Sequence, residues 1–140
     1  MQINSFYEPG SGTRTHLLTD EDRMRSAIID PVWVFDPVSG TTDLSFIDGI
    51  LDTADQAGYR IEWVLETHAH ADHLTAGDRI RQRTGARIAC GRGICAVQKN
   101  FVKVFNLKGV PTDGSQFDRL LDDGDIIHLG GLEIRVMDTP

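Results

Sequence analysis

The stretch Thr67-His68-Ala69-His70-Ala71-Asp72-His73 decides how this sequence is interpreted. It places three histidines and one aspartate within six consecutive residues. Neutral imidazole is the commonest transition-metal ligand in proteins, and a carboxylate adds a hard anionic oxygen. An incidental polar loop is the alternative, but these ligand types at this spacing favour a metal site. We therefore predict that a metal is bound by His68, His70, Asp72 and His73.

The spacing inside this histidine loop (residues 67–73) restricts the geometry of such a site. In an extended segment His68, His70 and Asp72 project to one side, because side chains alternate with a period of two. His73 then faces away, unless the chain begins to turn at Asp72. With a turn, His70 and His73 become neighbours three residues apart, and the loop can hold two adjacent metal positions.

The flanking segments predict a layered α/β protein. Residues 60–66 form an apolar strand that leads directly into the histidine loop, at the strand end where α/β proteins usually bind ligands. Strands are predicted over residues 3–8, 13–18, 25–35 and 86–90, the third of them interrupted by Pro31, which lacks a ladder donor. A helix is predicted from a cap at Thr42 or Asp43 to Gly58, a second over 76–83 ending at Gly85, and a helix or irregular helical turn over 93–105. Residues 125–129 and 132–138 are predicted to form a hairpin around Gly130-Gly131. We expect one domain, residues 1–140.

Composition and charge exclude several kinds of partner. The net charge is −7, from 14 basic and 21 acidic residues, which argues against a nucleic acid or an anionic membrane as a partner. No apolar run approaches the roughly 20 residues that cross a bilayer. The first residues lack the basic segment and apolar stretch of a secretory signal. Only two cysteines are present, Cys90 and Cys95, so free thiols in a reducing cytoplasm are expected.

The histidine loop resembles the T-H-x-H-x-D-H signature of the metallo-β-lactamase superfamily. The sequence also resembles the persulfide dioxygenase branch of this superfamily, to which glyoxalase II is closely related. The segments that carry this resemblance are residues 6–9, 13–18, 28–32 and 66–77. Residues 35–42 resemble the longer bacterial members called β-lactamase-hydrolase-like proteins. The resemblance covers essentially the whole chain and implies an αββα sandwich, here mainly its N-terminal half. It also implies that a strand such as residues 134–140 leads into a Gly-His pair, so we expect the chain to stop before the later metal-ligand motifs.

The resemblance implies two alternative metal centres. In dinuclear zinc hydrolases of this family, residues matching His68 and His70 hold one metal, and residues matching Asp72 and His73 hold the other. A metal-bound hydroxide is then the nucleophile, and we assign the catalytic role to Asp72. In persulfide dioxygenases, one Fe(II) is held by the residue matching His68 with a later histidine and aspartate, while the other three orient ligands and water. Fe(II) is the expected metal and Zn(II) the alternative.

Three functions are consistent with these features. The first is oxidation of a glutathione persulfide-type sulfur substrate by O2, and the second is hydrolysis of a glutathione thioester by a zinc enzyme. The third is a non-catalytic module that self-associates. We expect a small thiol, persulfide or thioester as the partner, and a homo-oligomer or a missing C-terminal half to cover an open apolar sheet face. By itself this chain should bind metal weakly and turn over poorly.

Three other side chains are weighed. Asp30 follows Ile28-Ile29 at a strand end and precedes Pro31. The family resemblance implies that it accepts hydrogen bonds beneath the histidine loop, and the alternative is an aspartate that caps a turn. His16 and His128 stand alone in predicted strands, which is typical of packed or surface histidines, and neither is included as a ligand.

Overall fold

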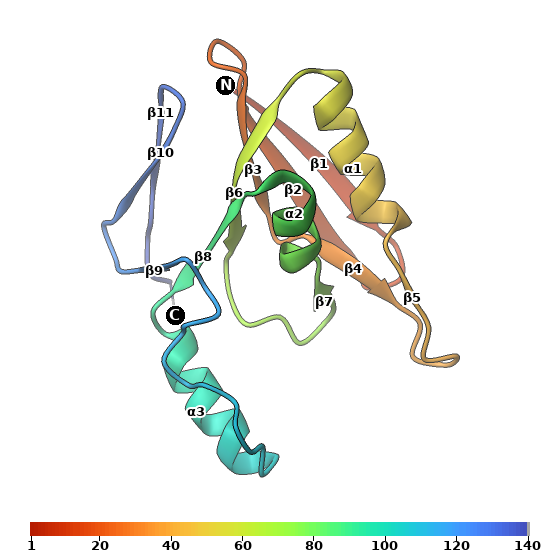
Figure 1. The fold of residues 1–140 in the computed structure, drawn as a ribbon, viewed down its shortest axis with the longest axis vertical. Coiled ribbons are helices and arrows are strands. Elements are labelled where there is room, and N and C mark those ends of the chain that lie inside the picture. Colours follow the sequence, from red (N-terminus) through yellow and green to blue (C-terminus); the bar gives the residue numbers. More distant parts are fainter. Residues whose placement is uncertain (140) are drawn as a thin grey trace.

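The computed structural model describes residues 1–139, and its centre is a six-stranded sheet in the order β1-β2-β3-β6-β8-β9 (Figure 1). These strands are β1 (Gln2–Glu8), β2 (Thr13–Asp20), β3 (Arg25–Ile29), β6 (Arg60–Glu66), β8 (Arg87–Gly91) and β9 (Arg119–Leu121). β1, β2 and β3 pair antiparallel, whereas β3, β6, β8 and β9 pair in parallel. The carboxyl ends of the parallel strands therefore meet at one edge, where the histidine loop leaves β6.

Helices and a hairpin lie on opposite faces of this sheet. The other elements are β4 (Val32–Phe35), β5 (Thr42–Asp43), α1 (Ser45–Gln56), β7 (Leu74–Thr75), α2 (Gly77–Thr84), α3 (Ile94–Val104), β10 (Ile126–Leu129) and β11 (Leu132–Arg135). Figure 1 shows α1 and α2 on one side of the sheet, the β10–β11 hairpin on the other, and α3 extending away from the body. The arrangement is the mixed α/β architecture that the sequence predicts.

Alternate residues of the central strands pack into two separate clusters, one on each face. Ile28 and Val64 are buried in the cluster formed with α1 and α2. Their neighbours Ala27 and Trp63 are buried in the second cluster, which includes Ile127 of the hairpin. Successive side chains of a strand point to opposite faces, so the central strands are apolar nearly throughout. This double burial fixes the position of β6 and hence of the loop that follows it.

The prediction of one strand over residues 25–35 is wrong. β3 ends at Ile29, and β4 belongs to a separate three-stranded sheet of order β5-β4-β7. Asp30 lies between them with φ 50, a left-handed conformation, and Pro31 has no N–H to continue a ladder. The chain therefore changes sheets at these two residues.

Three short strands also depart from the predictions. Thr42 and Asp43 form β5, and α1 begins at Ser45. Asp43 nevertheless caps the start of the helix, as one of the two predicted capping residues, because its Oδ1 accepts a hydrogen bond of 2.7 Å from the Ser45 backbone N–H. β7 and β9 were not predicted, because two or three residues carry no period of their own. The hairpin at Gly130-Gly131 and the end of α2 at the left-handed Gly85 are confirmed. Within residues 1–139, no helix is long and apolar enough to span a bilayer.

Candidate metal centre

The histidine loop joins the end of β6 to β7 and bends at residues 71–73. The bend brings the three imidazoles together. The ring centroids of His68 and His70 are 4.3 Å apart, and those of His70 and His73 are 4.2 Å apart. Of the two geometries that the spacing allows, the structure therefore has the turned one, in which His73 joins the other side chains.

A chain of hydrogen bonds sets the tautomer of His68. The Thr67 hydroxyl donates its single proton to Asp30 Oδ2 at 2.7 Å, and the Thr67 backbone N–H donates to Asp30 Oδ1 at 2.8 Å. His68 Nδ1 lies 2.8 Å from the same hydroxyl oxygen. Because that hydroxyl proton is already committed to Asp30, Nδ1 must carry the proton that it donates to Thr67. The Nε2 atom of His68 is then the nitrogen with a free lone pair.

The His70 ring is held through its Nε2 atom, which contacts two carboxylates, whereas the His68 ring is held through Nδ1. Glu66 Oε2 lies 2.9 Å and Asp30 Oδ1 lies 3.1 Å from this nitrogen, and the His70 side chain is only 5% exposed. Burial opposes the charged ring, but the hydrogen bonds with Asp30 and Glu66 outweigh it and raise the pKa of His70 to about 9. The other nitrogen, Nδ1, is buried and has no hydrogen-bond partner among residues 1–139.

His73 and Asp72 form the third part of the arrangement. His73 Nδ1 lies 3.1 Å from Asp72 Oδ2, which also accepts a hydrogen bond of 2.6 Å from the Thr13 hydroxyl of β2. The hydrogen bond from Thr13 is the largest cause, followed by the one with His73, of a pKa of Asp72 that lies well below its usual range. His73 Nε2 is buried without a hydrogen-bond partner in the described part of the chain. Asp72 Oδ1 lies 3.9 Å from the free Nδ1 of His70.

These residues fit a metal ion. Two sets of side chains each offer ligand atoms within 4.8 Å of one another, namely Asp30, His68 and His70, and His70, Asp72 and His73. Buried imidazole nitrogens without a partner are costly, and a coordinated cation would satisfy both of those seen here. Each ring is oriented by an acceptor on its other nitrogen, as in many metal-ligating histidines. Asp30 already accepts three hydrogen bonds, so its role is to orient the histidines.

The structure brings together all four side chains that the sequence singles out, and it adds two more. Of the alternatives for Asp30, the contacts show the acceptor beneath the loop. Glu66 was not considered, although its position four residues before His70 at the end of a strand is a usable signal. Thr13 lies 59 residues from Asp72 in sequence, so no local pattern could have indicated it.

The two histidines excluded as ligands lie outside this cluster. His16 Nδ1 is 2.7 Å from the Ser5 hydroxyl on β1, and His128 is 73% exposed on the hairpin. Cys90 is buried and Cys95 is half-buried, and both are free thiols, as predicted. Burial raises the pKa of the Cys90 thiol to about 11, so in the metal-free protein it is a thiol near neutral pH.

Comparison with known proteins agrees with the fold and the loop. Residues 29–140 match the metallo-beta-lactamase superfamily, and the chain belongs to that family. It is similar to a "Probable metallo-hydrolase" of Burkholderia pseudomallei, with 45% identity over all of this chain and 48% of that protein. It is similar to a "Beta-lactamase hydrolase-like protein" of Xylella fastidiosa, with 41% identity over 99% of this chain and 32% of that protein.

A solved structure supports the same assignment. The structure of ETHE1 from Myxococcus xanthus matches with a TM-score of 0.69 and 25% identity, over 96% of this chain and 47% of that one. The chain thus spans about a third to a half of the length of the relatives that it matches. The resemblance to β-lactamase-hydrolase-like proteins is confirmed by a relative of that name.

Proposed function

We propose that this chain carries part of the metal centre of an enzyme that uses Fe(II) and O2 to oxidise the outer sulfur of a small-molecule persulfide. The observation that carries metal binding is the arrangement of the three histidines, each with one ring nitrogen held by an acceptor and the other left free. The persulfide rests on the resemblance of residues 6–18, 28–32 and 66–77 to persulfide dioxygenases, for which the expected thiol is glutathione.

The stoichiometry of this reaction follows from electron counting. One O2 accepts four electrons, which takes the outer sulfur from oxidation state 0 to +4. A persulfide R–S–SH, one O2 and one H2O then give R–SH and sulfurous acid. The S–S bond breaks with its electron pair on the thiol sulfur, and three oxygen atoms, two from O2 and one from water, end on the oxidised sulfur. Bound Fe(II) would supply open coordination positions for sulfur and O2.

This chain's own residues would prepare the site for that chemistry. His68 presents Nε2 because Asp30 and Thr67 fix its tautomer. His70 is the ring that Glu66 and Asp30 lock in place beside it. Asp72, at 47% exposed, is the most accessible carboxylate of the cluster, and because its lowered pKa keeps it ionised it can orient water. On this basis His68 would be a ligand of a single iron, and His70, Asp72 and His73 would orient ligands and water, whereas all four would be ligands in a two-zinc centre.

A zinc-dependent hydrolase of a thioester is the second candidate, and one observation favours it. His70, Asp72 and His73 offer a second group of converging ligand atoms, which one iron bound through His68 would not use. Two metal ions side by side would bind both groups, and zinc would lower the pKa of a bound water to about 7. The name of the Burkholderia relative, a probable metallo-hydrolase, agrees with this alternative.

One experiment separates the two candidates. The protein is loaded with Fe(II) under anaerobic conditions or with Zn(II), and metal content is measured by mass spectrometry. Fe(II)-dependent O2 uptake with sulfite formation from a persulfide supports the dioxygenase, and Zn(II)-dependent thioester cleavage supports the hydrolase. His68→Ala should abolish either activity, whereas His128→Ala, at an exposed hairpin position, should not. Because this chain alone is expected to bind metal weakly and turn over poorly, both assays are run on a protein that also supplies the later metal-ligand motifs. Failure of that protein to bind either metal would refute both candidates.

A further inference from the structure

The pairing of β2 with β3 stops where the chain turns out of the central sheet, at Asp30 and Pro31. The last pair of this ladder is His16 with Ile29. The next pair would join Thr15 with Asp30, but Asp30 has φ 50 and the chain continues into a different sheet. The backbone groups on either side of Pro31 therefore lose the ladder partners that β2 would give them, and buried backbone groups need other partners.

The side chain of Thr15 supplies these partners. Its hydroxyl donates to the Asp30 carbonyl oxygen at 2.8 Å and accepts from the Val32 backbone N–H at 3.2 Å. Thr15 is 0% exposed and Val32 is 1% exposed, so water cannot replace either bond. One hydroxyl thus bridges the chain across Pro31. Together with the hydrogen bond of 3.0 Å from the Asp30 N–H to the Leu65 carbonyl oxygen, it holds Asp30 in its left-handed conformation.

The backbone held in this way carries the carboxylate that orients two histidines. Asp30 Oδ2 accepts from the Thr67 hydroxyl, whose oxygen lies 2.8 Å from His68 Nδ1, and Asp30 Oδ1 lies 3.1 Å from His70 Nε2. Hydrogen bonds weaken steeply when their angles are poor, so a displaced carboxylate would loosen both rings. Within residues 1–139, Thr15 has no hydrogen bond to either histidine, and its influence on them therefore passes through Asp30.

β2 presents a second threonine to the same site. Thr13 and Thr15 are two residues apart, so their side chains lie on one face of the strand, and Thr13 donates to Asp72 Oδ2 at 2.6 Å. β2 thus holds one aspartate of the site by its side chain and the other by its backbone. We propose that Thr15 is a positioning residue of the candidate metal centre, because its hydroxyl fixes the backbone of Asp30 and so the carboxylate that orients the imidazoles. The inference rests on the proposed metal centre, whichever metal binds there.

Thr15→Val tests the proposal, because valine keeps the shape of the side chain and removes the hydroxyl. Long-range proton–nitrogen NMR correlations in the metal-free protein should show an increased fraction of His68 protonated on Nε2. Zn(II) affinity, measured by chelator competition on a protein that also supplies the later metal-ligand motifs, should fall about threefold to tenfold. Thr15→Ser keeps the hydroxyl and should retain the tautomer and the Zn(II) affinity of the parent. If Thr15→Ser loses them as Thr15→Val does, the hydroxyl is not the cause and the proposal is overturned.

Thr19→Val is the matched control on the same strand. Thr19 is also 0% exposed, and its hydroxyl lies 3.0 Å from the Ser26 hydroxyl, but it is at the end of β2 far from the histidine loop. Both valine variants lose a buried hydrogen bond, so both should lower the Tm. Only Thr15→Val should change the tautomer and the Zn(II) affinity. Equal effects of the two variants on affinity would show a merely structural role for Thr15 and would contradict the proposal.

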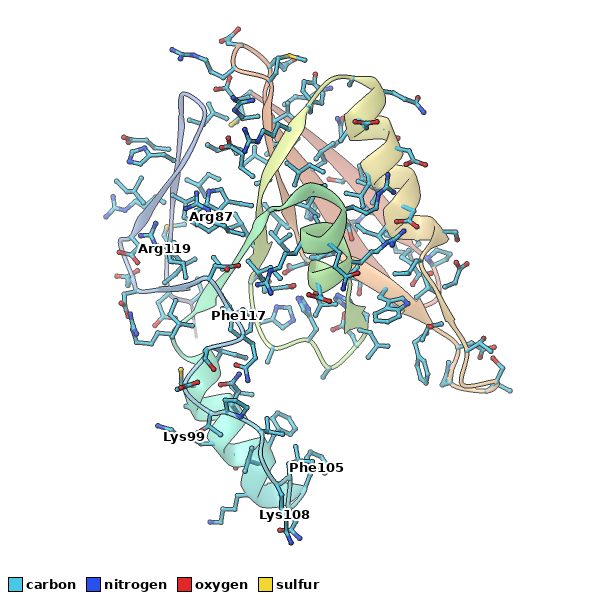
Figure 2. The ribbon with its side chains drawn as sticks, in the orientation of Figure 1. Arg87, Lys99, Phe105, Lys108, Phe117 and Arg119 are labelled. Atoms are coloured by element: carbon cyan, nitrogen blue, oxygen red, sulfur yellow. The ribbon has the colours of Figure 1, made fainter. Side chains whose placement is uncertain are left out.

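The opposite face of the sheet offers an internal check of packing. Trp63 is buried there, and Arg87 Cζ lies 3.9 Å from the centroid of its ring. Figure 2 shows Arg87 on the side of the sheet that faces the β10–β11 hairpin. The indole N–H resonance of Trp63 should keep its position in each variant. If it moves in Thr15→Val, the test rests on Thr15→Ser, for which loss of Zn(II) affinity overturns the proposal.

A double-mutant cycle tests whether Thr15 acts through Asp30. Asp30→Ala removes the carboxylate, so in that background Thr15→Val should change Zn(II) affinity by less than about twofold. An equal loss of affinity in both backgrounds overturns the proposal. The tautomer separates this failure from failure of the proposed function. A tautomer that shifts in Thr15→Val, in a protein that binds no metal, supports the positioning role and contradicts the proposed function, whereas an unchanged tautomer with normal metal binding has the opposite meaning.

Discussion

Asp30→Asn reverses the hydrogen-bond chain that sets the tautomer of His68. In the parent protein the Thr67 hydroxyl donates to Asp30 Oδ2 and accepts from His68 Nδ1. In the variant an amide NH2 takes the place of Oδ2 and donates to that hydroxyl, whose proton then turns toward His68 Nδ1. The ring must accept it, so its proton moves to Nε2 and the free lone pair facing the candidate centre is lost. The Thr67 backbone bond survives because the amide retains one carbonyl oxygen.

The expected magnitude follows from the contact that is lost. A hydrogen bond to a charged acceptor contributes roughly 1.5–3 kcal/mol, and the Asp30 side chain is only 15% exposed, so water compensates little. At about 1.4 kcal/mol for each factor of ten, this corresponds to a loss of metal affinity of about 10- to 100-fold. Substitutions of groups that orient metal ligands have effects of the same size.

Two measurements test this prediction. Long-range proton–nitrogen NMR correlations report the tautomer of His68 in the metal-free protein, and competition with a chromogenic chelator reports Zn(II) affinity. Asp36→Asn is the matched control. Asp36 likewise accepts from a backbone N–H at 2.8 Å and from a serine hydroxyl at 2.7 Å, but in an exposed loop. If Asp30→Asn leaves His68 protonated on Nδ1 and Zn(II) affinity within twofold of the parent, the argument from the hydrogen-bond chain is refuted.

Further predictions concern Thr13, His70 and the two cysteines. Thr13→Val removes the hydrogen bond to Asp72, so the pKa of Asp72 should rise and Zn(II) affinity should fall about tenfold; Thr13→Ser should keep both, and chelator competition tells them apart. The pKa of His70, raised from 6.5 to about 9, means that its proton stabilises the metal-free fold fully below pH 6.5. That stabilisation is lost as the pH rises through about 9, so the metal-free Tm should fall over this range, and a constant Tm would count against it. Metal uptake at pH 7.5 should release the same proton, which calorimetry detects as a dependence of the binding heat on the buffer. Iodoacetamide at pH 8 should label Cys95 well before Cys90, because burial raises the pKa of Cys90 to about 11; peptide mass spectrometry reads the order, and equal labelling would contradict the burial of Cys90.

The parts of the fold that were predictable are those whose signals are local. β6 is marked by its apolar residues Ile61, Trp63, Val64 and Leu65, and the β10–β11 hairpin is marked by Gly130-Gly131. The residues that β4, β5 and β7 contribute to their small sheet are too few to show a period. These strands exist because distant segments pair, Val32 with Thr75 and Val34 with Asp43. Pro31 indicates an interruption at this point, but the apolar pattern continues beyond it, so the change of sheet at Asp30 was not predictable.

The candidate site likewise has a part that local sequence predicts and a part that depends on distant segments. The clustering of the loop's side chains followed from their spacing, and the structure selects the turned geometry. The contact of Glu66 with His70 spans four residues and could have been suspected from the sequence. The contact of Thr13 with Asp72 spans 59 residues and depends on how β2 lies against the loop, which no short segment of sequence reveals. The choice between iron and zinc, and the ligand roles themselves, stay predictions, because the spacing of donors in this loop serves both metals.

The hydrogen bond from Thr13 to Asp72 has a consequence for how relatives are compared. The family match begins at residue 29, yet the side chain that holds the loop's carboxylate comes from β2, sixteen positions earlier. Two proteins can therefore share every residue of the histidine loop and still differ in what orients its aspartate. Sequence divergence in the N-terminal hairpin of β1 and β2 could therefore change how the shared aspartate is oriented. Alignments restricted to the matched region would not reveal that change.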